Sequence, residues 1–401
     1  MLVGAMRAWI LGLVLVLAAC GAPPVPVPPV PSLGGPAWTE LTSAHFTMWT
    51  DASPGRGREL LRQMEHLRQV VLGVAFPRAP AEGKSLVIAF RNAEEVGAYV
   101  PAQFTAYAWS GRGGIFQPLI VLNADPDLTD TRILTHELAH IISYAVIPDQ
   151  PRWFAEGLAG FFETVRLDAS NKLVDVGAPL DYVVRRIQEQ GLTPMAAVFA
   201  CTEPACMGDR YYATTWALFS YLVNVHPAAL LRYQTRIAEL AADAQASAWS
   251  EVFPELTAAQ LDVAVPAWFL HGSHRIWHFE VDLREPPITE RPIGDAEVHA
   301  ARGVLRHYFD RDGAAEPPEI AEALRADPTN LLAHLVRAMR TRGADPEQAR
   351  ELIAAHPDDW RAWWILGFAL QHGEAARIAR DKVCALAPNR AWLPRGMCPA
   401  L

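Results

Sequence analysis

The chain has 401 residues, of which 51% are hydrophobic and 20% charged, and its formal net charge is −9. This composition is typical of a globular protein and excludes a disordered chain, while the length exceeds what one hydrophobic core usually organises, so we expect two domains. Because no run of Lys or Arg is interleaved with aromatic residues, nucleic acid is not expected as a partner.

Residues 1–19 have the features of a signal peptide. Arg7 precedes an apolar run over residues 8–19, which is too short for a comfortable transmembrane span. The run ends in Leu-Ala-Ala-Cys-Gly, which resembles the lipobox of bacterial lipoproteins and implies that Cys20 carries a lipid anchor. An ordinary signal peptide that contains a cysteine is the alternative. Gly21 stands where the signal for retention in the inner membrane would place Asp, so the resemblance implies an outer-membrane lipoprotein that faces the periplasm.

Residues 20–37 are rich in proline and predict an extended tether between membrane and folded domain. Four cysteines follow, an even number that predicts two disulfides in an oxidising compartment: Cys201, Cys206, Cys384 and Cys398. Three connectivities are possible, and closeness in sequence favours Cys201–Cys206 with Cys384–Cys398. A cysteine zinc site at the first pair is the alternative.

Residues 38–285 are expected to form an α+β domain. Strand patterns cover residues 46–50, 85–90 and 115–123, and a helix with apolar residues at helical spacing lies between the first two. Further helical patterns follow at residues 182–190, 210–225, 228–241 and 258–270. This order predicts a small mixed sheet beside a helical part.

Residues 295–401 are expected to form a second, all-α domain. Helix ends recur about every thirty residues, at 324–328, 353–357 and 386–388. Trp363, Leu366 and Gly367 match the W-x2-L-G start of a tetratricopeptide repeat, and Pro388 closes that copy. The segment therefore resembles degenerate helical repeats, although its period is shorter than usual. The resemblance implies a surface that binds a protein partner.

Residues 135–142 contain an H-E-x-x-H motif formed by His136, Glu137 and His140. The apolar residues around it recur at helical spacing, so the motif is expected on a helix. Two histidines four residues apart then lie on one helix face, close enough to bind one metal ion. Glu137 lies about 100° round the helix from His136, where its carboxylate can reach a metal-bound water without binding the metal.

The third ligand is indicated by residues 151–163, which read P-R-W-F-A-E-G-L-A-G-F-F-E with helical periodicity. Glu156 falls in the first turns of this expected helix. H-E-x-x-H followed by W-[FL]-x-E-G resembles the gluzincin metallopeptidases of the peptidase MA type, in which a glutamate on the second helix is the third zinc ligand. The resemblance covers residues 38–281. Gly157 is expected to let this helix approach the zinc helix closely.

The resemblance implies a zincin-like fold and a zinc peptidase that hydrolyses peptides or proteins. Zn²⁺ would be bound by His136, His140 and Glu156, with water at an open fourth position, and Glu137 would be the general base. Such families stabilise the oxyanion with a tyrosine or histidine from a later helix. Tyr212 is the candidate and Tyr211 its competitor, and a role as core tyrosines is equally open. His226 could fill the role, but a helix cap is the preferred interpretation.

The sequence departs from the best-known gluzincins at one position. They place an aspartate four residues after the glutamate ligand to orient a zinc histidine, and here that residue is Gly160. We interpret Glu163 as a solvated helix residue, with orientation of a zinc histidine as the alternative. His271, His274 and His278 lack a completing carboxylate and are interpreted as surface or core residues.

Peptidases of this class hold the substrate backbone against an exposed sheet edge. The strand at 115–123 is the candidate for that edge, and an internal strand is the alternative. A rival function is a non-catalytic lipoprotein that binds partners through its repeats. Proteins of that kind usually lose the base or a ligand, whereas this sequence keeps all four residues, which favours the enzyme.

Overall fold

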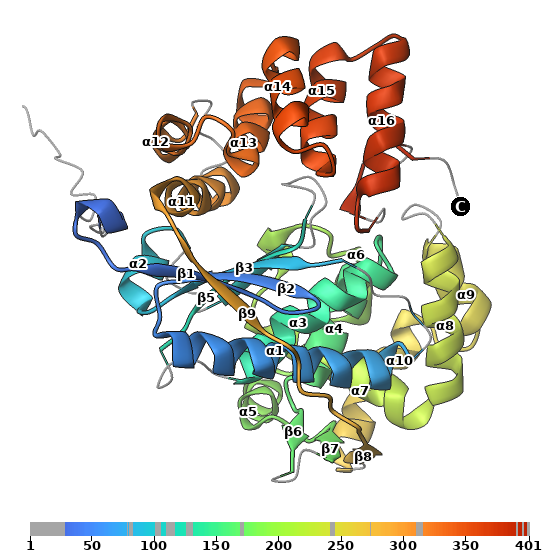
Figure 1. Cartoon of the computed structure of the whole chain (residues 1–401). Helices are drawn as coiled ribbons and strands as arrows, with labels where there is room; N and C mark the ends of the chain where they lie inside the picture. Colours follow the sequence, from blue (N-terminus) through green and yellow to red (C-terminus); the bar gives the residue numbers. More distant parts are fainter. Residues whose placement is uncertain are drawn as a thin grey trace, which may run out of the picture.

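The computed structural model describes residues 29–77, 79, 83–100, 106–109, 117–125, 131–168, 172–240, 245–272, 274–309, 316–389, 392–394 and 397–398. The predicted signal peptide and the predicted lipidation of Cys20 lie outside the described residues, as does the first half of the tether. Within the described part of the chain, no helix is both long enough and apolar enough to span a membrane. The architecture is α+β, as predicted (Figure 1).

A six-stranded mixed sheet lies at the centre of the molecule, with the strand order β4-β5-β3-β2-β1-β9. Strands β2, β3 and β5 are parallel, whereas β4, β1 and β9 each run antiparallel to their neighbours. The strands are β1 (Trp38–Thr42), β2 (Phe46–Thr50), β3 (Ser85–Phe90), β4 (Ala106–Trp109), β5 (Leu119–Asn123) and β9 (Thr289–Ile293).

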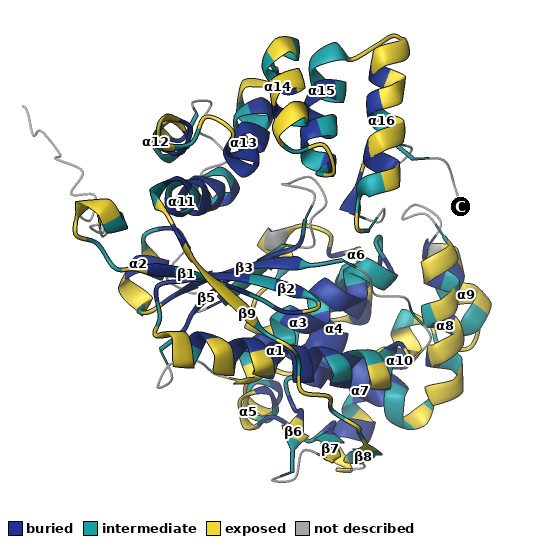
Figure 2. Cartoon of the chain, in the orientation of Figure 1, coloured by how far each residue is buried: buried dark blue, intermediate teal, exposed yellow. Residues whose placement is uncertain are grey.

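Both faces of the sheet are covered, which explains why β3 and β5 are continuous apolar runs. Side chains alternate between the faces along a strand. On β3, Val87 and Ala89 enter one core, whereas Leu86, Ile88 and Phe90 enter the other. Figure 2 shows the buried central strands beside the exposed edge strand β9.

The first face carries α1 (Pro54–Ala75) and α3 (Thr131–Val146), which pack against each other, while α4 (Arg152–Phe162) packs on α3. Ser53 caps α1, because its hydroxyl accepts a hydrogen bond from the N–H of Arg56. Behind α4 lies α7 (Asp209–Val225). The remaining helices of this part are α5 (Asp181–Gln190), α6 (Met195–Ala200), α8 (Pro227–Glu239), α9 (Gln245–Val252) and α10 (Ala258–Leu270).

The second face carries the C-terminal helices. Ile88 of β3 belongs to the same core as Val304 and Leu335 of two C-terminal helices, so the sheet and these helices, which lie on its second side in Figure 1, share one core. Their ends at residues 326, 355 and 386 agree with the predicted helix ends. The helices are α11 (Asp295–Phe309), α12 (Pro318–Ala326), α13 (Leu331–Thr341), α14 (Pro346–Ala355), α15 (Trp360–Leu370) and α16 (Glu374–Leu386).

Several elements have no counterpart among the predictions. Strands β4 and β9 extend the main sheet, and a second, three-stranded sheet is formed by β6 (Arg166–Leu167), β7 (Leu173–Val176) and β8 (Trp277–Glu280). Short helix α2 (Ala93–Gly97) follows β3. The predicted cysteine pairing is confirmed: disulfides join Cys201 to Cys206 and Cys384 to Cys398.

Candidate metal centre

The two motif histidines project from α3 on the side opposite its buried apolar stripe. Leu134, Leu138 and Ile142 anchor the helix in the core, so the remaining face presents His136 and His140. Their side chains are partly buried, and their Nε2 atoms lie 3.0 Å apart. The four-residue spacing predicted this proximity.

Glu156 on α4 completes the group. Its Oε2 lies 3.3 Å from His140 Nε2 and 3.6 Å from His136 Nε2, and its side chain is buried. Tetrahedral coordination with bonds of about 2.0–2.2 Å places ligand atoms about 3.3–3.6 Å apart. The three atoms therefore have a spacing suited to one metal ion, and they form the only such group of His, Cys, Asp and Glu in the described part of the chain.

The three ligands also pair electrostatically with one another. Burial disfavours the charged form of Glu156, but the His140 and His136 rings outweigh it and hold the pKa of Glu156 well below its usual range. Burial likewise opposes protonation of His136, yet hydrogen bonds to Glu156 and Glu163 hold its pKa well above the usual value. A metal ion bound here would take the place of a proton on these ligands.

Glu163 is not a solvated helix residue, so that interpretation was wrong. Its Oε1 lies 2.7 Å from His136 Nδ1, and its Oε2 accepts a hydrogen bond of 2.7 Å from the Tyr182 hydroxyl. Seven residues are close to two helical turns, so Glu163 lies on the same side of α4 as Glu156. The alternative interpretation holds: Glu163 orients His136 from the ring nitrogen that faces away from Glu156.

Gly157 lies against α7 and not against α3, in contrast to the prediction. A Cβ atom at this position would lie 2.7 Å from the carbonyl oxygen of Thr215 and 2.8 Å from Phe219 Cβ, both on α7. Gly160 faces α7 as well, where a Cβ would meet Trp216 at 3.4 Å. The two glycines therefore bring α4 close to α7, and this contact supports Glu156 from behind.

Glu137 lies beside the three ligands and next to the edge of the sheet. Its carboxylate accepts a hydrogen bond from the backbone N–H of Ala108 in β4. Burial raises the pKa of Glu137 above the usual value, although the His136 and His140 rings act in the opposite direction. A raised pKa makes the carboxylate a stronger base at neutral pH.

The two candidate tyrosines differ in their surroundings. Tyr211 is buried, and its hydroxyl has no hydrogen-bond partner among the described residues. Tyr212 is partly exposed, and burial, with the charge of Glu156 adding to it, raises its pKa to about 12. Its hydroxyl senses the charge of Glu137 as well. Tyr212 therefore keeps its proton at neutral pH and lies near both Glu137 and Glu156.

The strand predicted at 115–123 is internal, so its interpretation as the substrate edge was wrong. Its described part, β5, lies between β3 and β4. The edge next to α3 belongs instead to β4, which is antiparallel to β5 and stands at the end of the sheet in the described residues.

The other histidines that the sequence singled out lie elsewhere. His226 is the C-cap of α7 and contacts the Tyr221 hydroxyl, as the preferred interpretation held. His274 packs against Trp216 and Trp268, whereas His278 is exposed and pairs with Asp175. His271 is exposed and contacts the Ala267 carbonyl oxygen. These histidines are surface or core residues, as predicted.

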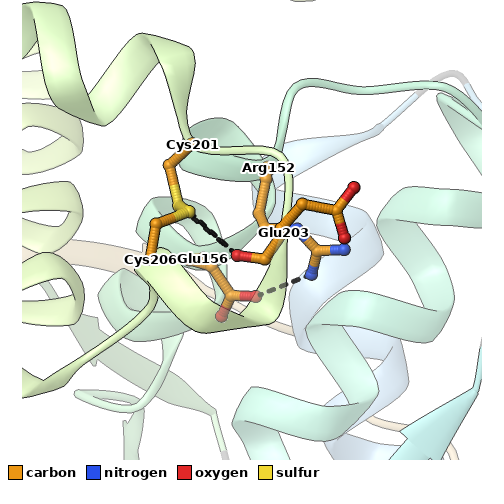
Figure 3. Close-up of a disulfide and its surroundings, with 5 residues drawn as sticks. All are labelled: Arg152, Glu156, Cys201, Glu203 and Cys206. Atoms are coloured by element: carbon orange, nitrogen blue, oxygen red, sulfur yellow. Dashed lines mark hydrogen bonds and ion pairs between the residues drawn. A yellow bond between two sulfur atoms is a disulfide. The ribbon is translucent and has the colours of Figure 1, made fainter.

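Two side chains near the candidate ligands were not identified from the sequence. Arg152 Nη1 lies 3.9 Å from Glu156 Oε1, beside the Cys201–Cys206 disulfide (Figure 3). The Tyr144 ring lies 6.3 Å from the His140 ring. Arg152 precedes Glu156 by four residues, and Tyr144 follows His140 by four, so helical spacing alone could have identified both.

Searches against protein-family models and curated proteins found no match to this sequence.

Proposed function

We propose that this protein is a zinc-dependent peptidase of the gluzincin type, exported and lipid-anchored in the bacterial envelope. The observation that carries the proposal is the grouping of the His136, His140 and Glu156 ligand atoms within 3.0–3.6 Å, with Glu137 beside them. Two imidazoles and one carboxylate are the ligand set of many catalytic zinc sites, and they leave a fourth position open. This donor set favours zinc over magnesium or calcium, which prefer oxygen ligands.

Zinc, when bound, would lower the pKa of a water molecule and polarise the carbonyl group of the scissile bond. Glu137 would accept the proton of the attacking water and deliver it to the leaving amine nitrogen. Tyr212 would donate a hydrogen bond to the carbonyl oxygen as negative charge develops there. Glu163 fixes the orientation of His136 throughout.

The substrate backbone would pair with β4. Its position at the end of the sheet and the contact between Ala108 and Glu137 support this proposal, since an extended peptide added to this edge would pass directly by the base. The proposed export is supported by the two disulfides, which persist in oxidising compartments.

Elemental analysis of the purified protein tests the metal. Wild type and Glu137→Gln are expected to bind one zinc ion per chain, whereas Glu156→Ala is expected to lose most of it. Only wild type is expected to cleave a broad peptide library. A wild-type protein that takes up no zinc when supplied with it would overturn the proposal. Zinc uptake without any cleavage would leave a metal-binding protein and favour the partner-binding alternative.

A further inference from the structure

A cavity of about 500 Å³ lies beside the candidate metal centre. It is lined by the segment between α3 and α4, by the end of α6, and by residues of α8 and α9. Its volume falls within the range of cavities that bind small molecules or single side chains. None of its lining residues has a part in the proposed hydrolysis.

Two lining residues connect the cavity to the metal ligands. Tyr144 follows His140 by one helical turn, with the two rings 6.3 Å apart. Arg152 contacts the Glu156 carboxylate at 3.9 Å (Figure 3). Each of these two side chains therefore lines the cavity and also lies next to a candidate metal ligand. If a scissile carbonyl lies at the metal, the side chain of an adjacent substrate residue can reach the cavity.

The cavity has aromatic walls. Trp153 lies 5.7 Å from Phe199 and 5.6 Å from Trp249, and Phe199 lies 4.9 Å from Trp249, measured between ring centroids. Tyr233 stacks on Trp153 at 5.8 Å and meets Trp249 edge-to-face at 5.6 Å, again between ring centroids. A further aromatic ring in the cavity would pack against these rings in the same offset or edge-to-face way.

One side-chain atom of a lining residue lacks a hydrogen-bond partner. Gln150 is only 6% exposed, and its Oε1 has no hydrogen-bond partner among the described residues. Its Nε2 donates to Ser143 Oγ at 2.8 Å, and Ser143 Oγ in turn donates to the His140 carbonyl oxygen at 3.2 Å. The single hydroxyl proton of Ser143 is donated to the His140 carbonyl oxygen, so Ser143 Oγ can only accept from Gln150. The group of Gln150 that faces Ser143 must therefore be the amide nitrogen. The amide oxygen is left as an acceptor.

We propose that this cavity is a specificity subsite that receives a tyrosine or tryptophan side chain adjacent to the scissile bond. The aromatic walls take the ring, and Gln150 Oε1 accepts a hydrogen bond from the phenol O–H or the indole N–H. Arg152 and Asp149 both line the cavity, so charge alone favours neither a basic nor an acidic side chain there. The inference rests on the proposed peptidase function.

Peptide cleavage by the full-length, zinc-loaded protein tests the subsite. In a series of peptides that differ only next to the scissile bond, kcat/KM is expected to be highest for Tyr and Trp, about tenfold lower for Phe, and lower again for Leu. Gln150→Leu is expected to remove the preference for Tyr over Phe. Gln245→Leu is the matched control, because it removes another glutamine side chain from the same lining, leaves the Gln150–Ser143 bond intact and keeps the preference. Equal cleavage of all peptides, or a preference for basic residues, would overturn the subsite.

A binding measurement separates failure of the subsite from failure of the peptidase. Saturation-transfer NMR of N-acetyltyrosinamide and N-acetylphenylalaninamide with the Glu137→Gln protein requires no turnover. Stronger binding of the tyrosine amide, lost in Glu137→Gln/Gln150→Leu, supports the cavity even if wild type cleaves no peptide. Cleavage without aromatic preference and without binding of either amide would refute the subsite and leave the peptidase standing. Absence of both cleavage and binding would refute both.

Discussion

His136 Nδ1 and Glu163 Oε1 lie 2.7 Å apart, and this contact ties the first ligand on α3 to the end of α4. Gly160 occupies the place where the best-known gluzincin metallopeptidases carry an orienting aspartate, and Glu163 contacts His136 from about one turn further along the helix. The longer glutamate side chain covers the added distance, and Tyr182 holds it in place through the second carboxylate oxygen. His136 is thereby held with Nε2 toward Glu156 and His140.

Loss of this contact should weaken zinc binding without unfolding the protein. Glu163→Ala is expected to lower zinc affinity by about 10–100-fold, because the ring loses both its orientation and a partner that raises its basicity. Competition with a chelating dye measures the change. Glu189→Gln, at an exposed position on α5, serves as the control. Unchanged affinity in Glu163→Ala would show that the contact has no part in metal binding.

Tyr212 and Tyr211 form a natural pair for testing the oxyanion donor. Tyr212→Phe is expected to lower kcat by about 10²–10³-fold with zinc content unchanged, because one hydrogen bond to the developing charge is lost. Tyr211→Phe should leave kcat within a few-fold of wild type, since its hydroxyl is buried. The opposite result would transfer the role to Tyr211.

Glu65 makes the stability of the sheet dependent on pH. Its carboxylate accepts hydrogen bonds from Ser43 Oγ at 2.6 Å and from the His45 N–H at 2.9 Å, and it lies 2.8 Å from His45 Nδ1. Burial alone would raise the pKa of Glu65, but these hydrogen bonds outweigh it and lower the pKa below its usual 4.5. A lowered folded-state pKa adds stability above the unfolded pKa, and this is lost as pH falls through the folded-state value.

Glu65→Gln is therefore expected to lower the free energy of unfolding by about 1–3 kcal/mol at pH 7. The difference from wild type should shrink as the pH falls below 4, where the wild-type carboxylate also becomes protonated. Urea unfolding at several pH values measures both quantities. A difference that stays constant with pH would mean that the stabilisation does not depend on the charge of Glu65.

A buried ion pair joins the sheet region to the C-terminal helices. Arg302 Nη2 on α11 donates to Glu95 Oε1 on α2 at 2.7 Å, and both side chains are almost fully buried. Removal of one partner leaves the other without compensation, so Arg302→Ala is expected to cost about 3–5 kcal/mol of stability. Asp381→Asn, which breaks the exposed Arg377–Asp381 pair, should cost less than about 1 kcal/mol. Similar losses for both variants would contradict a special role for the buried pair.

The parts of the site that the sequence predicted are those set by local geometry. His136 and His140 meet because four residues span about one helical turn. Glu156 required the resemblance in addition, since nothing in the spacing between α3 and α4 fixes how the two helices approach. Glu163 lies on the same face of α4 as Glu156, seven residues later, but a glutamate at this spacing is equally typical of a solvated residue. Only the position of α3, which brings His136 next to Glu163, shows that it is not solvated.

The missed strands depend on partners that are remote in sequence. β9 reads T-E-R-P-I, without an apolar alternation, and contains Pro292, which is tolerated because the strand lies at a sheet edge. It pairs with β1, about 250 residues earlier, so no local pattern indicates it. β4 is only four residues long and equally lacks a clear local signal. The strands with strong apolar runs, β3 and β5, were recognised because both faces are buried.

Gly157 and Gly160 show another limit of prediction from sequence. Helical periodicity tells which residues share a helix face, but it does not tell which neighbouring helix that face meets. Here both glycines face α7, and Gly157 lies closer to it than Gly160 does. Gly157→Ala would place a Cβ at 2.7 Å from a backbone oxygen, so α4 must move away from α7, and we expect a loss of about 1–3 kcal/mol in stability. Because Glu156 is the adjacent residue, zinc affinity should fall as well.

Gly160→Ala is the matched test on the same helix. Its Cβ would meet Trp216 Cδ1 at 3.4 Å, which is ordinary contact, while alanine favours a helix interior over glycine by about 1 kcal/mol. This variant should therefore be as stable as wild type or more so, with unchanged zinc affinity. Thermal unfolding and zinc titration of the two variants compare the positions directly. If both alanines are tolerated equally, the contact between α4 and α7 does not position Glu156, and the α3–α4 contact alone must do so.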